Sequence, residues 1–376
     1  MSWDTILNQE RVKEILRSIL EKRRIAHAYL FSGPAGAGMD AMAMEFAKVV
    51  NCEKATAEAC DACPNCQKVN RHQHPDIHLV FPLPVGKGEK SGDTPTGKIA
   101  EEELTAVREQ IVLKWNNPYH RIFIPRATAI KINSIRDIRK EVSLMSSGRG
   151  KKVFILLDAE TMNAESSNAL LKTLEEPPPD TLLILTTTQP DQLLPTLVSR
   201  CQLIRFQSLT AENICRGLME RENIPEQDAG TIARLSRGNY TEALQLLHSD
   251  YRKRHDDILD FLRTSVKRSK AGLPQLIDRI TDDMERDEII ESLRFLQSWL
   301  RDAMIIHHDP GSAVEEEALQ KFSERFTAVD YQSADMEIER AISLIEKNVY
   351  IPIILLTLAF SLAKSITGQP AERIRS

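Results

Sequence analysis

The chain has 376 residues, of which 42% are hydrophobic and 27% charged, and its net charge at pH 7 is −5. This length suggests two or three domains with substantial cores. The slightly acidic balance excludes a globally basic nucleic-acid-binding protein, so any DNA contact has to come from a local patch. No apolar run approaches the ~20 residues of a membrane span, and the first residues lack the pattern of a secretory signal. We therefore expect a cytoplasmic protein that is not in a membrane.

Short apolar runs alternate with helical patterns over the first 207 residues. The runs cover residues 28–31, 153–157, 182–185 and 203–206. This alternation predicts a parallel sheet with helices on both faces, which is an α/β fold. A stretch rich in Gly, Lys, Thr and Pro, residues 85–98, interrupts the pattern and is expected to be a flexible insertion.

The strand signal stops after residue 207. Residues 210–250 predict about three short helices, and residues 251–376 read as amphipathic helix throughout. We therefore predict three domains. They are an α/β core at 1–207 with a cysteine module at about 50–70, a small helical lid at 208–250, and an all-α domain at 251–376.

Four of the six cysteines are clustered, with the spacing C-x7-C-x2-C-x2-C. In a reducing compartment such clustering indicates metal ligation rather than disulfides. Four thiolates can surround one Zn²⁺ tetrahedrally and leave no open position, so the predicted site is structural. The alternative is a set of buried free cysteines. The ligands are Cys52, Cys60, Cys63 and Cys66.

Residues 31–40, FSGPAGAGMD, join an apolar run to a helical pattern. Strand, glycine-rich turn and helix is the layout of a loop that cradles phosphates. Up to Gly38 the spacing fits G-x-x-x-x-G-K-[ST], with Gly33 as its first glycine and Gly36 within it. Met39 then replaces the lysine and Asp40 replaces the hydroxyl residue. The loop therefore predicts a nucleotide-site scaffold without its chemistry.

A second part of such a site comes later in the chain. The apolar run at 153–157 ends in Asp158, where a P-loop protein keeps its magnesium-binding carboxylate. Ala159 stands where an ATPase would place a glutamate to orient water. Glu160 follows, but a shift of one residue at a strand end turns a side chain to the other face.

Several motifs occur in the same order as in the bacterial DNA polymerase III clamp-loader subunits, which are AAA+ proteins. The resemblance spans residues 1 to about 250 closely and beyond that rests on helical character, where the family has a collar domain. It implies a pentameric ring with gamma/tau and delta subunits that loads the sliding clamp onto primer-template DNA. The motifs are residues 6–9, 27–34, the four-cysteine hairpin, 74–76, 168–177 and 199–201.

Four positions separate this chain from the motor subunits of the family, gamma/tau. Motor subunits carry Lys and Thr/Ser at the positions of Met39 and Asp40, Glu at that of Ala159, and a second sensor arginine at that of Thr241. The chain therefore resembles the delta-prime branch, with no ATPase activity and no tight ATP binding. Thr187 holds the first sensor position and is interpreted as a remnant. The alternative is an ATP-hydrolysing motor with a non-standard loop.

Two further sites follow from the resemblance. In the family, the arginine of Ser199-Arg200-Cys201 is an arginine finger that reaches the ATP of the next subunit; the alternative is a surface arginine in a salt bridge. The family also tracks duplex DNA with helices of its core domains, and Arg136, Arg139 and Lys140 share one predicted helix. Basic residues there suit phosphate contacts, and a solvated helix face is the alternative. Neighbouring cations are Lys131, Arg149, Lys151 and Lys152.

Overall fold

The computed structural model describes residues 2–54, 57–143, 150–248, 251–267, 272–308, 317–347 and 349–368. They form two compact units, Met1–Gln245 and Leu246–Ser376. The first unit contains the predicted core together with nearly all of the predicted lid. The division into three domains at 207 and 250 stays a prediction.

A five-stranded, fully parallel sheet is the centre of the first unit, in the order β2-β3-β4-β1-β5. Strand β1 lies between β4 and β5, with Ala28 opposite Leu183 and Tyr29 opposite Gln202. The glycine-rich loop therefore emerges from an interior strand. The strands are β1 (Ala28–Ser32), β2 (Ile77–Val80), β3 (Lys152–Leu156), β4 (Thr181–Thr187) and β5 (Gln202–Arg205).

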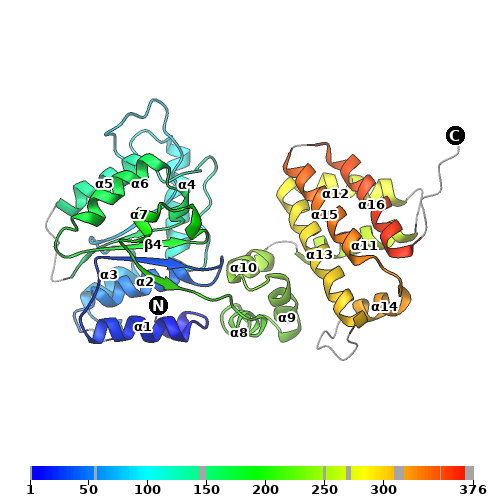
Figure 1. Cartoon of the computed structure of the whole chain (residues 1–376), viewed down its shortest axis with the longest axis horizontal. Helices are drawn as coiled ribbons and strands as arrows, with labels where there is room; N and C mark the ends of the chain where they lie inside the picture. The colour runs from blue at the N-terminus through cyan, green and yellow to red at the C-terminus, as the bar shows by residue number, and fades with distance from the viewer. Residues whose placement is uncertain are drawn as a thin grey trace. The chain divides into compact units, whose positions relative to one another are not determined.

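Both faces of this sheet are covered, which explains why its inner strands are almost continuously apolar. On one face Leu30 and Phe154 belong to a core with Ile135 and Leu170, which come from helices α5 (Ile132–Ser143) and α6 (Ala164–Glu175). On the other face the Tyr29 ring meets Phe46 of α2 (Met39–Val50) edge-on at 5.4 Å. Figure 1 shows α1 (Glu10–Glu21), α2 and α3 (Pro64–Asn70) on one side of the sheet and α5 and α6 on the other. The predicted α/β class is confirmed.

The helices of the first unit connect and cover these strands. Three short 3-10 helices accompany them, η1 (Trp3–Thr5), η2 (Ala159–Thr161) and η3 (Pro190–Gln192). The α-helices are α1 (Glu10–Glu21), α2 (Met39–Val50), α3 (Pro64–Asn70), α4 (Glu101–Asn116), α5 (Ile132–Ser143), α6 (Ala164–Glu175), α7 (Pro195–Val198), α8 (Ala211–Glu222), α9 (Glu226–Leu235) and α10 (Tyr240–His248).

The second unit is helical throughout its described residues, as predicted. Its core is formed by fully buried side chains such as Phe261, Leu293 and Leu355. None of the helices in the described part of the chain combines the length and apolar character needed to cross a bilayer. The helices are α11 (Tyr251–Lys267), α12 (Gly272–Asp283), α13 (Arg286–His308), α14 (Glu317–Arg325), α15 (Tyr331–Glu346) and α16 (Ile351–Thr367).

The insertion at 85–98, expected to be flexible, is held against the core by one buried lysine. The ammonium group of Lys131 donates to the carbonyl oxygens of Pro84 at 3.0 Å and Pro95 at 2.7 Å, and to the Glu89 carboxylate at 2.8 Å. Asn133 adds a bond to the same carboxylate at 2.8 Å. The composition of the segment gave no sign of this anchor, because the anchoring residues lie more than 30 positions away in the chain.

Candidate functional site

The four clustered cysteines lie close enough to share one metal ion, because their sulfur atoms are all within 4.8 Å of one another. Backbone amides point at three of these sulfurs: Cys60 N–H at Cys52 Sγ, Cys63 N–H at Cys60 Sγ and Cys66 N–H at Cys63 Sγ, at 3.3–3.4 Å. Such amides stabilise thiolates, the form that binds metal. The geometry therefore fits a closed four-thiolate site.

A buried lysine ties this cysteine module to the helix of the glycine-rich loop. Lys48 of α2 lies 3.0 Å from the Glu45 carboxylate and 2.8 Å from that of Asp61, which neighbours Cys60. The Lys48 and Glu45 side chains are each only 1% exposed. Burial raises the pKa of Glu45 to about 7, although Lys48 opposes this shift. The cysteine module and the loop helix are therefore joined by a buried ion-pair cluster.

We expect Lys48→Met to lower the free energy of unfolding by about 3–5 kcal/mol, because it leaves the Glu45 carboxylate buried without a partner. The raised pKa of Glu45 sets the pH dependence. Protonated Glu45 favours the folded state, and this contribution is complete below the unfolded pKa of Glu45 and lost as pH rises through its folded pKa. Without Lys48 the folded pKa of Glu45 rises further. The destabilisation should therefore be larger at pH 8 than at pH 5, as measured by urea unfolding.

The matched control for this experiment is Lys68→Met, which removes an exposed lysine from the neighbouring helix α3. That variant should unfold like the wild type at both pH values. Equal stability of Lys48→Met and the wild type, or a defect that grows toward pH 5, would contradict the interpretation.

The glycine-rich loop is packed against other parts of its own unit. Gly36 and Gly38 have φ angles of +70° and +93°, which residues with a side chain rarely adopt. A Cβ at Gly36 would lie 1.9 Å from Asn239 Oδ1, and one at Gly38 would lie 2.8 Å from the Tyr119 hydroxyl. The first glycine, Gly33, faces Phe206 in the same way. These glycines are therefore needed for packing within the chain, whether or not a phosphate binds.

The two residues that replace the lysine and the hydroxyl begin helix α2. Met39 is buried, at 7% exposed. Asp40 is ion-paired with Lys114 near the end of α4, at 2.6 Å between Nζ and Oδ2. Lys114 also donates to the carbonyl oxygen of His120 at 2.8 Å, and its side chain is only 3% exposed. Asp40, which departs from the loop motif, is thus paired with Lys114, a residue 74 positions later in the chain.

The end of β3 carries a second carboxylate. Asp158 has a φ angle of +52°, and its pKa is raised to about 6, first by burial and then by the nearby carboxylates of Asp40 and Glu160. Ala159 is fully buried. Glu160 accepts hydrogen bonds from the Thr188 amide at 3.1 Å and hydroxyl at 2.8 Å. Its carboxylate is thereby engaged at the end of β4.

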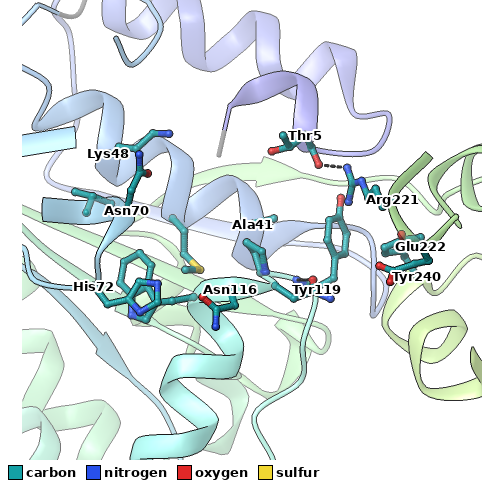
Figure 2. Close-up of a pocket in the computed structure, with 15 residues that line it drawn as sticks. Thr5, Ala41, Lys48, Asn70, His72, Asn116, Tyr119, Arg221, Glu222 and Tyr240 are labelled. Atoms are coloured by element: carbon teal, nitrogen blue, oxygen red, sulfur yellow. Dashed lines mark hydrogen bonds between the residues drawn. The ribbon is translucent and has the colours of Figure 1, made fainter. Parts of the chain in front are cut away.

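Tyr119 joins three parts of the first unit. Its hydroxyl accepts the amide of Leu7 at 2.9 Å, and its carbonyl accepts the hydroxyl of Thr241 at 2.7 Å. Its ring meets that of Tyr240 edge-on at 4.9 Å. The guanidinium of Arg221 lies over both rings, at 5.4 and 5.5 Å. Figure 2 shows this arginine beside the Tyr119 ring, bonded to the carbonyl of Thr5.

Most predicted residues of the nucleotide scaffold line a single cavity of about 610 Å³. Ala159 and Gly33 do not line it. Sequence reasoning missed Lys114 and Tyr119, which also line it, because nothing near them in the chain marks them. It also did not single out Asn239, although this residue lies two positions before Thr241. The predicted residues that the fold brings together are Gly36, Gly38, Met39, Asp40, Asp158, Thr187 and Thr241. Thr187 accepts the amide of Gln189 at 3.1 Å.

Arg200 does not line this cavity. Its Nη2 lies 2.9 Å from the Glu175 carboxylate, and its Nη1 donates to the carbonyl oxygen of Thr196 at 2.8 Å. The side chain is still 36% exposed. Within the isolated chain it therefore takes part in a surface salt bridge, which was the alternative interpretation, while its side chain remains partly exposed.

The predicted basic patch is smaller than the sequence suggested. Lys131 and Lys152 are buried, at 8% and 6% exposed, so including them was wrong. Both bond to acceptors of their own unit. Arg149 lies outside the described residues.

On helix α5, Arg139 and Lys140 are exposed, whereas Arg136 is half-buried and bonds to the hydroxyl of Ser91. Arg139 lines a hollow of about 400 Å³ together with Lys172, which the sequence had not singled out. The same hollow contains Glu175 and Glu176, which reduce its positive charge.

Comparison with known proteins connects these features to a family. The family model described as "DNA polymerase III, delta subunit" matches residues 8–210. DNA polymerase III subunit delta' of Bacillus subtilis is 32% identical over 251 residues, which is 66% of this chain and 63% of that protein. Subunit delta' of Pseudomonas aeruginosa is 30% identical over 254 residues, 66% of this chain and 64% of that protein.

The motor branch is also similar. DNA polymerase III subunit tau of Bacillus subtilis is 30% identical over 251 residues, 65% of this chain and 37% of that protein. Among solved structures, a gamma subunit-related protein of Thermotoga maritima covers 94% of this chain and 99% of its own, with a TM-score of 0.46 and 16% identity. The matched region is thus less than two thirds of each curated relative.

The match to the family model lies within the first unit, which holds the glycine-rich loop and the four cysteines. The family model alone covers more than half of the chain. The chain therefore belongs to the family of DNA polymerase III delta subunits, as a clamp-loader subunit of the delta-prime type.

Proposed function

We propose that the chain is a non-catalytic subunit of the DNA polymerase III clamp loader, which supports ATP-dependent loading of the sliding clamp onto primed DNA. Its partners are the gamma/tau and delta subunits, and through the complex the sliding clamp and primer-template DNA. The observation that carries the proposal is the loop of residues 33–40. There the phosphate-binding lysine is absent and Asp40 is paired with Lys114 of the same chain.

The chemistry of the loop argues against ATP hydrolysis. Losing the lysine removes charge-assisted bonds of about 1.5–3 kcal/mol each to the phosphates. Asp40 adds a negative charge where the polyphosphate would lie, and the like charges repel. Ala159 cannot orient a water molecule, and Thr241 bonds to Tyr119 in place of a phosphate. Each of these features weakens either nucleotide binding or turnover.

The purified chain should show no ATP turnover above a protein-free blank, and a fluorescent ATP analogue should not bind tightly with or without Mg²⁺. Met39→Lys should not restore turnover, because Asp40, Ala159 and Thr241 remain. Motor-like turnover by the wild type, unchanged in Met39→Lys, would instead favour a gamma/tau-type motor with a non-standard loop.

The active contribution of the chain is assigned to Arg200. It is proposed to act as an arginine finger in trans, stabilising charge on the γ-phosphate bound to a neighbouring gamma/tau subunit. The partly exposed side chain of Arg200 supports this role. To reach a phosphate, Arg200 would break its ion pair with Glu175 and bind the more highly charged phosphate instead. The planar guanidinium suits this, because it can bind phosphate with two parallel hydrogen bonds.

The helical second unit is proposed to be a collar that holds the chain in the ring. Helix α16 carries exposed apolar side chains at the spacing of one helical face, Ile353, Leu356 and Phe360, next to exposed Tyr350. An apolar stripe of this kind suits contact with a helix of a neighbouring subunit. We assign the stripe to the adjacent collar of the complex.

Two further assignments complete the proposal. The four cysteines hold a structural Zn²⁺ that has no part in chemistry, since four thiolates leave no open position. Arg136, Arg139 and Lys140 of α5 contact the DNA backbone. The protein then works in the cytoplasm, at the nucleoid-associated replisome.

A further inference from the structure

The two positions that hold magnesium in P-loop proteins are both carboxylates in this chain. In such proteins the metal is bound by the hydroxyl after the loop lysine and by an aspartate at the end of a neighbouring strand. Here these positions are Asp40 and Asp158, and Glu160 is close enough to raise the pKa of Asp158 further. Three carboxylates around one cavity repel one another unless a cation lies among them.

We propose that the ammonium group of Lys114 is the resident cation of this site and takes the place that Mg²⁺ occupies in a working P-loop protein. Its Nζ lies 2.6 Å from Asp40 Oδ2, and the Lys114 side chain is 3% exposed. Burying a lysine is costly unless an anion pairs with it, and Asp40 supplies that partner. Lys114 and Arg121 are also the two cations that oppose the raised pKa of Asp158, so their charge reaches the second metal position.

The fold fixes this ammonium group in place from both sides. Lys114 lies near the C-terminal end of α4, and its second hydrogen bond, to the carbonyl oxygen of His120, closes the turn that follows the helix. Within that turn Tyr119 is bonded to Leu7 and Thr241, which come from opposite ends of the first unit. The ammonium group is therefore held by a turn that is itself anchored, and it balances the charge of Asp40 without a bound metal.

The inference deepens the proposed lack of a working nucleotide site, and it rests on that proposal only for its biological meaning. It explains why the carboxylates are present, whereas the loss of catalysis alone requires only the absence of the lysine. The native protein should have no use for a divalent cation here, and removal of Lys114 should create a demand for one.

The test is Mn²⁺ binding to the full-length, zinc-loaded chain without nucleotide, followed by electron paramagnetic resonance. The wild type should bind no Mn²⁺ at this site, whereas Lys114→Met should gain one Mn²⁺ site with at least tenfold higher affinity, competed by Mg²⁺. Adding Asp40→Asn to Lys114→Met should abolish the gain. The matched control is Arg108→Met, which removes an exposed cation from the same helix and should behave like the wild type.

A second measurement covers the case in which Lys114→Met is poorly folded. Its thermal midpoint should rise on addition of Mn²⁺ or Mg²⁺, while that of the wild type stays unchanged. Wild-type protein that binds Mn²⁺ as tightly as the variant would overturn the inference. So would a variant that gains no affinity, or one that stays unfolded with and without metal. None of these outcomes depends on ATP turnover, so the inference and the proposed function can fail separately.

Discussion

Replacing Cys66 by serine should abolish the proposed zinc binding and unfold the cysteine module at about residues 50–70. Cys66 is fully buried, and its amide and sulfur are both part of the four-cysteine cluster. Structural zinc supplies about 10–16 kcal/mol of apparent binding energy to small modules at pH 7. Removing one thiolate from a closed site should therefore lower the free energy of unfolding by about 5 kcal/mol or more. Zinc content by mass spectrometry and amide hydrogen exchange measure the two effects.

The control for this variant is Cys201→Ser, because Cys201 lies outside the cluster. It should retain one zinc per chain and normal exchange in the module. Through Lys48, which is bonded to Asp61 of the module, the loss of zinc should also increase exchange in α2. A Cys66→Ser protein with full zinc content and unchanged exchange would contradict the assignment.

In a complex reconstituted with the proposed partners, replacing Arg200 by alanine should remove most ATP turnover at the motor site that Arg200 is proposed to serve. An arginine finger is worth on the order of 10³–10⁵ in turnover at its site. Because other motor sites keep their own fingers, DNA-stimulated phosphate release by the whole complex should fall by the share of that single site. The measurement compares complexes assembled with wild-type or variant chain at equal subunit composition.

Two matched variants separate the finger from a structural salt bridge. Glu175→Gln removes the ion pair but leaves the guanidinium, so turnover should be kept. Arg216→Ala removes an exposed arginine that is also paired with a glutamate, and turnover should again be kept. An unchanged rate of phosphate release with Arg200→Ala, or an equal fall with Glu175→Gln, would contradict the arginine-finger assignment.

The sequence predicted the features that are encoded by neighbouring residues. Four of the five strands show as apolar runs, whereas β2 (Ile77–Val80), which contains a histidine, was not predicted. The four clustered cysteines also lie close together along the chain. The glycine-rich loop is likewise continuous, so the replacement of its lysine by Met39 and of its hydroxyl residue by Asp40 was visible directly. Positions such as Asp158 could be placed because parallel strands end at one edge of a sheet.

The remaining features depend on contacts between distant parts of the chain. Lys114 lies in an ordinary helical pattern, and only the fold reveals its pairing with Asp40. The same holds for Lys131, which looked like a surface cation and is an anchor for the insertion. Exposure of a charged side chain cannot be read from its type alone, because long cations can be buried wherever acceptors surround them.

The several bonds of Tyr119 have a consequence for how the protein responds to the cell. A bound nucleotide holds two parts of a protein together only in proportion to its concentration and affinity. Tyr119 belongs to the same polypeptide as Leu7 and Thr241, to which it is hydrogen-bonded, so the effective concentration of these contacts is constant. The linkage between the N-terminal segment, the loop and helix α10 therefore persists when ATP is scarce. The conformation of this unit should not depend on the energy charge of the cell.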